Sequence, residues 1–374
     1  MRGRENLQGT AFYTINVEDL IGQDHPLRPI KAMVDRELLE LHREFSKAYG
    51  RVGRPSIPPE TLLKAMLLQA LYSIRSERQL VERIRTDLLF RWFLDLSPGD
   101  EVFHHTVFSH NRARLEEHGL IQRFFDGVVR QAMEAGLTSD DHFTVDGTLI
   151  RSHASLKSLK PIDKDDEDGP SDGSRGGRNR GVDFRGTKRR NRTHRSSTDP
   201  EALLYRKGDG QPAYLSHTGH LITENRHGLI IAVGVDEASG LAERRQALEM
   251  LDHAYWEHGI WPRTLSADKG YDDGTFLLEL EDRVVEPHVA IRSGPIRGST
   301  ERSAIRRATR ARQRRKTYRL SQRRRKLIEE AFGWMKTIGG VARAAVVGRW
   351  KVRQRFTMTA AAFNLLRMSR LCPG

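Results

Sequence analysis

The spacing of apolar residues changes once along the chain, near residue 140, and this change limits the possible folds more than any other feature. Before it, apolar residues such as Leu62 and Met66 recur at helical spacing. From His142 onward the segment FTVDGTLI alternates instead, which predicts a strand followed by a second short strand. We therefore expect an all-helical domain over residues 1–135 and a mixed α/β domain over 136–374, with helices packed on a sheet.

The second domain contains further elements that its sequence pattern predicts. Two strands are expected within 212–236, one within 263–268 and one within 284–292. Helices are expected at 239–258 and 321–338, and the tail MTAAAFNLLRMSRL predicts a last helix. The order of these elements indicates an α/β fold.

The helical domain has short helices with Arg-rich turns, as in RQLVERIRTDLLFRWF. This pattern is typical of a helix-turn-helix-like DNA-binding domain. It suits equally well a small bundle whose charges are simply solvated, and the pattern alone leaves both interpretations open.

The charge balance points to a polyanionic partner. The 374 residues include 63 Lys and Arg against 49 Asp and Glu, a formal net charge of +14. Such a surplus is typical of proteins that bind nucleic acid. Much of it lies in two runs, Arg175–Arg195 and Arg302–Lys326, in which we expect contacts with DNA phosphates. The first run belongs to a low-complexity stretch at about 157–200 that has too few apolar residues to build its own core and is interpreted as an insertion.

The sequence also restricts where the protein works. The only cysteine is Cys372, which excludes an intramolecular disulfide and a Cys-based zinc site. No apolar run approaches the roughly 18 residues of a membrane span, and no apolar segment near the N-terminus predicts a secretory signal. We expect a cytoplasmic protein with no membrane partner.

Three acids stand out by their positions. Asp146 lies inside an apolar strand, Asp268 ends the strand TLSAD, and Glu329 lies on the helix RRKLIEEAFGWMK. A carboxylate on a buried strand is costly unless something compensates its charge. Two divalent ions roughly 3.5–4 Å apart would do so, and would support phosphoryl transfer. Each acid also has an ordinary interpretation, as a turn, cap or ion-pair residue.

The helix expected at 321–338 adds a more specific pattern. Arg325, Glu329, Gly333 and Lys336 fall on one stripe, which places a carboxylate between two cations, beside a glycine that leaves room for close approach. Glu330 is rotated about 100° away from this stripe, so Glu329 is the preferred acid.

At this point the chain resembles the DDE transposases of bacterial insertion sequences, of the insertion-sequence-four/five superfamily and five-like type. The last acid of that superfamily lies in Tyr-x2-Arg-x3-Glu-x6-Lys, and the matching positions here are Gln322, Arg325, Glu329 and Lys336, with Gln in place of Tyr. TVDGT and SADKGY resemble the segments around the first two acids. GRPSIPPETLLKAMLLQALYSIRSERQLVERI resembles the N-terminal helical domain, so the resemblance covers roughly residues 10–370.

The resemblance implies an RNase H-like catalytic core behind an N-terminal all-α DNA-binding domain. It implies that Asp146, Asp268 and Glu329 are both the catalytic and the metal-binding residues, holding two Mg²⁺ ions for which Mn²⁺ can substitute. It further implies binding of terminal inverted repeats, hydrolysis that frees a 3′-OH, and attack of that 3′-OH on target DNA.

The expected partners are double-stranded DNA, as element ends and target, and a second copy of the chain on that DNA, in the nucleoid of a bacterial cell. The expected DNA-binding residues are basic side chains of the helix at 321–338 and of the two basic runs: Arg325, Lys336, Lys188, Arg189, Arg190, Arg323 and Arg324. Two alternatives remain open, a transposase-derived DNA-binding regulator without catalysis and an RNase H-like nuclease without strand transfer.

Overall fold

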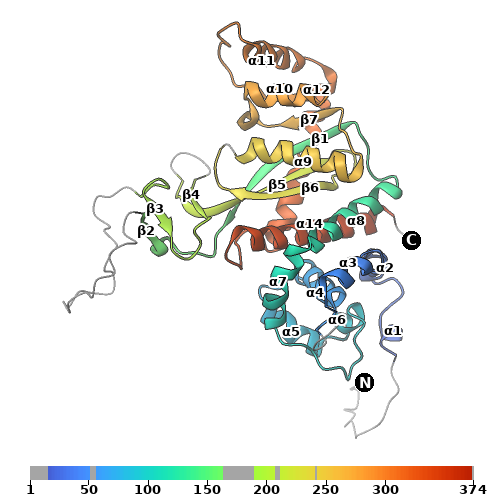
Figure 1. Ribbon diagram of the computed structural model, residues 1–374. Coiled ribbons are helices and arrows are strands. Elements are labelled where there is room, and N and C mark those ends of the chain that lie inside the picture. Colours follow the sequence, from blue (N-terminus) through green and yellow to red (C-terminus); the bar gives the residue numbers. More distant parts are fainter. Residues whose placement is uncertain (1–15, 51–55, 163–188, 207–210, 241, 373–374) are drawn as a thin grey trace, which may run out of the picture.

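The computed structural model describes residues 16–50, 56–162, 189–206, 211–240 and 242–372 (Figure 1). In the first part of the chain, all the described elements of secondary structure are helices. Its helices are α1 (Val17–Leu20), α2 (Leu27–Glu40), α3 (His42–Ala48), α4 (Pro59–Leu71), α5 (Glu77–Thr86), α6 (Leu88–Phe93), α7 (Thr106–Glu117) and α8 (Leu120–Glu134).

Local sequence explains where these helices begin. Pro59 occupies the first turn of α4, where its missing N–H would have had no partner in the helix. Ser76 precedes α5, and its hydroxyl accepts a hydrogen bond from the backbone N–H of Gln79. α8 ends at Glu134 and the first strand begins at His142, so the change from helix to strand lies where the apolar spacing predicts it.

The second part of the chain is built on a mixed sheet. The strands are β1 (His142–Arg151), β2 (Leu159–Pro161), β3 (His194–Ser196), β4 (Leu203–Tyr205), β5 (Tyr214–Glu224), β6 (Ile230–Glu237), β7 (Thr264–Ala267) and β8 (Glu286–Val289). The main sheet has the order β4-β5-β1-β7-β8, with β6 also paired to β5. β1 is central, antiparallel to β5 and parallel to β7, and β8 continues the parallel side.

Helices cover both faces of this sheet: α9 (Ala242–His258), α10 (Gly274–Asp282), α11 (Glu301–Arg312), α12 (Lys316–Arg324), α13 (Leu327–Thr337) and α14 (Arg349–Leu371) (Figure 1). A Cβ on Gly219 would meet Phe356 of α14, and one on Gly234 would meet Gln246 of α9. His220 pairs with Gly234 across the strands, and neighbouring residues of a strand point to opposite faces. α14 and α9 therefore lie on opposite faces.

α14 joins the two parts of the chain. It packs against α4 and α8 as well as against β6. The side-chain amide of Asn364 is buried and bonds both the N–H and the C=O of Ile230, at 2.9 and 2.7 Å. The result is one continuous apolar core that runs from α2 to α14. No helix among the described residues is long and apolar enough to cross a membrane.

Two expectations about local structure were wrong. Residues 142–151 form one strand rather than two, because β5 pairs with them without interruption past Gly147. The helix expected at 321–338 is divided into α12 and α13, because the chain tightens at Arg325 and Lys326, whose carbonyls accept from residues three positions ahead.

The described ends of the stretch at 157–200 contain two short strands. β2 and β3 form a small antiparallel sheet, and Leu159 joins a separate apolar cluster with Ala154, Ala202 and Leu215. A buried polar network stabilises the same region, since Asp199 accepts from Ser152 at 2.6 Å and lies 3.0 Å from His217 Nε2. Residues 163–188, with most of the first basic run, lie outside the described residues.

Candidate active site

The three acids singled out in the sequence line one open cavity of about 450 Å³. Asp146 comes from β1, Asp268 from the end of β7 and Glu329 from α13. In the sequence, Asp268 lies 122 positions after Asp146 and Glu329 lies 183 positions after it, so only the tertiary fold brings the three acids together.

The register of β1 and β7 explains why the two aspartates meet. The strands run parallel with Thr144 opposite Ser266, and the two hydroxyls are 2.7 Å apart. Asp146 and Asp268 each lie two residues further on, so both point to the same side at the carboxyl end of the paired segment. This is the edge at which parallel sheets commonly bind their ligands.

Asp146 is the most buried carboxylate of the three, with its side chain 25% exposed. Its Oδ1 accepts the N–H of Gly147 at 2.8 Å, and its Oδ2 lies 3.5 Å from Nη1 of Arg325. Burial raises the pKa of Asp146 to about 6, and the negative charges of Asp268 and Glu329 add to the increase. The site therefore concentrates more negative charge than its own cations compensate.

Asp268 is exposed and also shapes the turn that follows β7. Its Oδ1 accepts the N–H of Gly270 at 2.7 Å. A Cβ on Gly270 would lie 2.9 Å from that same oxygen, so a larger residue there would require the carboxylate of Asp268 to shift. Asp268 is therefore a turn residue, as its ordinary interpretation predicts. The same hydrogen bond also fixes the direction of its carboxylate.

Glu329 and Glu330 have different surroundings although they are adjacent. Glu329 faces the cavity, whereas Glu330 forms an ion pair with Nη1 of Arg367 at 2.9 Å. The apolar side of α13 is buried, as the sequence predicts, through Ile328, Ala331, Phe332 and Met335. That burial fixes the rotation of the helix and with it the direction of Glu329.

A fourth carboxylate, Glu243, lines the same cavity and was not among the expected residues. It lies in the first turn of α9. Burial raises the pKa of Glu243 to about 7, with further contributions from Asp268 and Asp146. No sequence signal distinguishes it, because an acid in the first turn of a helix is already explained by the helix dipole.

Two of the cations expected to contact DNA lie at the cavity. Arg325 and Lys336 both line the cavity. Gln322, at the position of the family's Tyr, donates to the carbonyls of Ala267 and His288, and so holds α12 against the ends of β7 and β8. Gln322 therefore has a structural role at the position where the family has Tyr.

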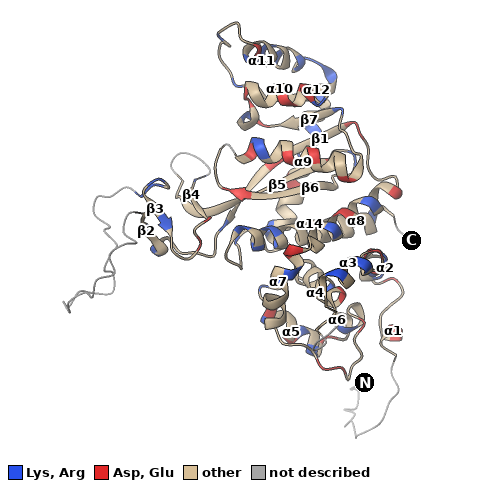
Figure 2. Ribbon diagram, in the orientation of Figure 1, with Lys and Arg blue, Asp and Glu red and all other residues tan. Residues whose placement is uncertain are grey.

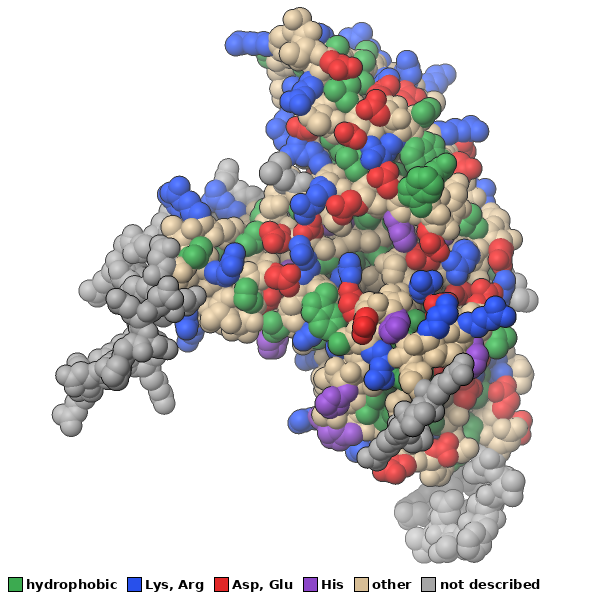
Figure 3. Space-filling view, viewed as in Figure 1, with side chains coloured by type: hydrophobic (Ala, Val, Ile, Leu, Met, Phe, Trp, Pro, Cys, Tyr) green, Lys and Arg blue, Asp and Glu red, His purple; other side chains and the backbone are tan. Residues whose placement is uncertain are grey.

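The basic run from Arg302 to Lys326 is only partly available for DNA. Arg306 forms two hydrogen bonds of 2.8 Å with Asp272, and Arg312 pairs with acids of the neighbouring elements. Arg323 and Arg324 are exposed and have no ion pair with any described residue. In Figure 2 the Lys and Arg positions of α11 and α12 lie at one end of the molecule, and Figure 3 shows basic side chains on the surface at that end.

Only the end of the first basic run, Arg175–Arg195, lies within the described residues. Lys188 lies outside the described residues. Arg189 precedes β3 and donates to the carbonyl of Leu156 at 3.2 Å, and Arg190 is exposed next to it. Arg189 and Arg190 lie next to the small β2–β3 sheet, which projects from the main sheet (Figure 1).

The chemistry of the cavity follows from its donor set. It presents four carboxylates and no imidazole or thiolate among its lining residues, which is the oxygen-only set that hard divalent cations such as Mg²⁺ prefer. The neighbouring Arg325 and Lys336 are suited to phosphate. The arrangement fits metal-assisted chemistry on a phosphodiester.

Comparison with known families gives two matches. Residues 138–365, more than half of the chain, match the family model described as Transposase DDE domain. Residues 15–114 match the model described as Transposase domain (DUF772). No curated protein and no solved structure matches the chain.

Proposed function

The chain belongs to the DDE transposase family, enzymes with an RNase H-like core that cleave DNA and transfer strands, and we propose that Asp146, Asp268 and Glu329 are the residues with which it does so. The observation that carries this assignment is the convergence of the three acids from β1, β7 and α13 on one cavity. The expected fold class and the expected family are both confirmed.

The family uses divalent metal ions, and we propose two Mg²⁺ ions here, with Mn²⁺ able to replace them. The raised pKa of Asp146 supports this, because a cation stabilises the charge of a buried carboxylate that has other carboxylates beside it. Asp146, central in the sheet, would contact both ions, while Asp268 and Glu329 would each hold one. When bound, such ions activate a nucleophilic oxygen and stabilise the leaving oxygen of a phosphodiester.

The side chains around the carboxylates orient the DNA. Arg325 and Lys336 flank the acids and would hold the phosphates next to the scissile bond. Gly333 lies one turn beyond Glu329, and a Cβ there would meet no atom within 4 Å. The surface of α13 at this point is therefore open for close approach of the DNA backbone.

Binding of longer DNA would use surfaces away from the cavity. Transposase domains bind DNA, and we propose that the helical part recognises the terminal inverted repeats. Arg323 and Arg324 extend the basic surface from the cavity along α12, and Arg189, Arg190 and Lys188 would add a second contact. Because each cavity holds one set of acids, pairing two element ends calls for two copies of the chain. Such a complex would form on DNA in the bacterial nucleoid.

The neighbouring glutamates of α13 provide a matched test. Glu329→Gln should abolish cleavage of a duplex carrying the element ends in Mg²⁺, whereas Glu330→Gln should cleave nearly as well as the wild type. Asp146→Asn and Asp268→Asn should behave like Glu329→Gln, and all of them should keep their DNA affinity in a gel-shift assay. Cleavage by Glu329→Gln but not by Glu330→Gln would move the site to Glu330.

The same assay distinguishes the alternatives. A wild-type protein that binds the ends but cuts neither strand in Mg²⁺ or Mn²⁺ would be a regulator. One that cuts the ends but never joins a 3′-OH to a second duplex would be a nuclease. We expect joined products with the wild type and none with any of the three acid variants.

A further inference from the structure

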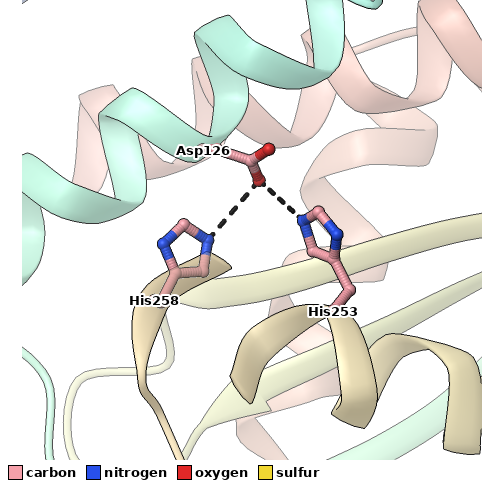
Figure 4. A group of neighbouring side chains, drawn as sticks. All are labelled: Asp126, His253 and His258. Carbon is pink, nitrogen blue, oxygen red and sulfur yellow. Dashed lines mark hydrogen bonds and ion pairs between the residues drawn. The ribbon is translucent and has the colours of Figure 1, made fainter. Parts of the chain in front are cut away.

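A second group of potential metal ligands lies far from the active site, between α8 and α9. Asp126 comes from the middle of α8, and His253 and His258 come from the last turns of α9 (Figure 4). We call these three residues the Asp126 cluster. α8 is the last helix of the helical part, and α9 lies on the sheet, so the cluster spans the junction between the two parts of the chain.

The donor atoms of the cluster have the spacing of ligands around one ion. Nε2 of His253 lies 3.0 Å from Oδ1 of Asp126, and Nε2 of His258 lies 3.4 Å from the same oxygen. One ligand atom from each residue falls within 4.8 Å of the others. Donors that each lie about 2.0–2.1 Å from a tetrahedral zinc ion are about 3.3 Å apart, which is close to these separations.

His258 supplies an independent sign that something is bound. Its side chain is fully buried. Its Nδ1 has no hydrogen-bond partner among the described residues, and its Nε2 has only the long contact of 3.4 Å with Asp126, which does not meet hydrogen-bond geometry. A buried polar atom without a partner is costly, and such atoms are rare in native proteins. Figure 4 shows the ring of His258 turned toward the carboxylate of Asp126, as is the ring of His253. An ion between the two rings and the carboxylate would give Nε2 of His258 a ligand bond in place of this long contact.

The surroundings complete a coordination sphere. The side-chain amide nitrogen of Gln122 lies 3.0 Å from Oδ1 of Asp126 and 3.4 Å from Nε2 of His253. Rotation of this amide by half a turn would place its oxygen there as a fourth donor. Asp126 is 4% exposed, while His253 is 36% exposed, so an ion could enter from the side of His253.

We propose that Asp126, His253 and His258 form a structural site for a borderline transition-metal ion, of which Zn²⁺ is the best match. Two imidazole nitrogens and one carboxylate suit Zn²⁺, whereas Mg²⁺ prefers oxygen donors. The ion would fasten the helical part to α9, whose first turn carries Glu243 about 22 Å away along the helix axis. The site thus differs from the catalytic cavity in place, donor set and ion, and it does not depend on the catalytic assignment.

The test is a Zn²⁺ titration of the untagged full chain in excess Mg²⁺, which occupies oxygen-only sites. The wild type should bind one equivalent of Zn²⁺, and a chelator should lower its thermal midpoint. His253→Ala, at a partly exposed position where folding is least at risk, should weaken Zn²⁺ binding by more than about tenfold and remove the effect of the chelator. Asp126→Asn should do the same, and Co²⁺ should give a visible absorption band with the wild type only.

Glu257→Gln is the matched control. Glu257 is next to His258 and pairs with Arg130 across the same α8–α9 interface, at 3.2 Å, but it takes no part in the cluster. This variant should keep both the Zn²⁺ equivalent and the response to the chelator, as should Asp146→Asn in the catalytic cavity. The proposal is overturned if the folded wild type binds no Zn²⁺ in excess Mg²⁺, or if His253→Ala binds it as tightly as the wild type. Either result would mean that the cluster is held by hydrogen bonds alone.

Discussion

Replacing Glu37 by Gln should make the protein more stable at alkaline pH. Glu37 lies on α2, and its side chain is only 1% exposed. Its carboxylate rests against α8 at Gly127, where a Cβ would lie 1.8 Å from the carboxylate carbon. Neither of its oxygens has a hydrogen-bond partner among the described residues, and Nη2 of Arg130 is 3.5 Å away. The charge is therefore buried with little compensation.

The size and the sign of the effect follow from the pKa. Burial raises the pKa of Glu37 from 4.5 to about 7, although Arg130 partly opposes the increase. At about 1.4 kcal/mol per pH unit, this difference corresponds to about 3 kcal/mol. The folded state binds this proton more tightly than the unfolded state. The stability that the neutral form provides is therefore fully present below pH 4.5 and is lost as the pH rises through about 7.

Thermal unfolding at two pH values measures this effect. Glu37→Gln keeps the shape of the side chain and removes the charge, so it should raise the midpoint by several degrees at pH 8 and change it little at pH 4.5. Glu40→Gln is the control, because Glu40 is on the same helix but is exposed. A midpoint at pH 8 that falls in Glu37→Gln would refute the reasoning, since it would show that the pairing with Arg130 outweighs the cost of burial.

Three other substitutions test the proposed DNA site. Gly333→Ala should raise the stability of the free protein by up to about 1 kcal/mol, since a Cβ there meets no atom, yet weaken DNA binding; unchanged DNA affinity would show that no backbone approaches α13. Replacing Arg323 and Arg324 by Ala should lower DNA affinity and make its salt dependence shallower by about one per lost phosphate contact, and an unchanged slope would remove α12 from the DNA path. Glu243→Gln should raise the Mg²⁺ concentration needed for half-maximal cleavage several-fold, while Glu330→Gln should not; equal requirements would exclude a role of Glu243 in holding the ions.

The sequence alone was sufficient for features that depend on local periodicity. The change from helical to strand spacing near residue 140 appears in the structure between α8 and β1. Glu329 and Lys336 reach one cavity because they lie seven residues, about two turns, apart on one face of α13, and the apolar side of α13 fixes which face that is. Arg325 reaches the same cavity from the end of α12. The ordered motifs around the acids were enough to recognise the family, which the family matches confirm.

Only the tertiary structure decided which charged groups face one another, because their partners come from distant segments. It placed Glu243 beside Asp146, although in the sequence Glu243 resembles an acid that interacts with the helix dipole. It also paired Arg306 with Asp272, although in the sequence Arg306 resembles a DNA contact. It also brought Asp126 within reach of His253 through the packing of α8 on α9. Sequence spacing defines the face of an element, but strand register and helix packing define what that face meets, and these depend on the whole core at once.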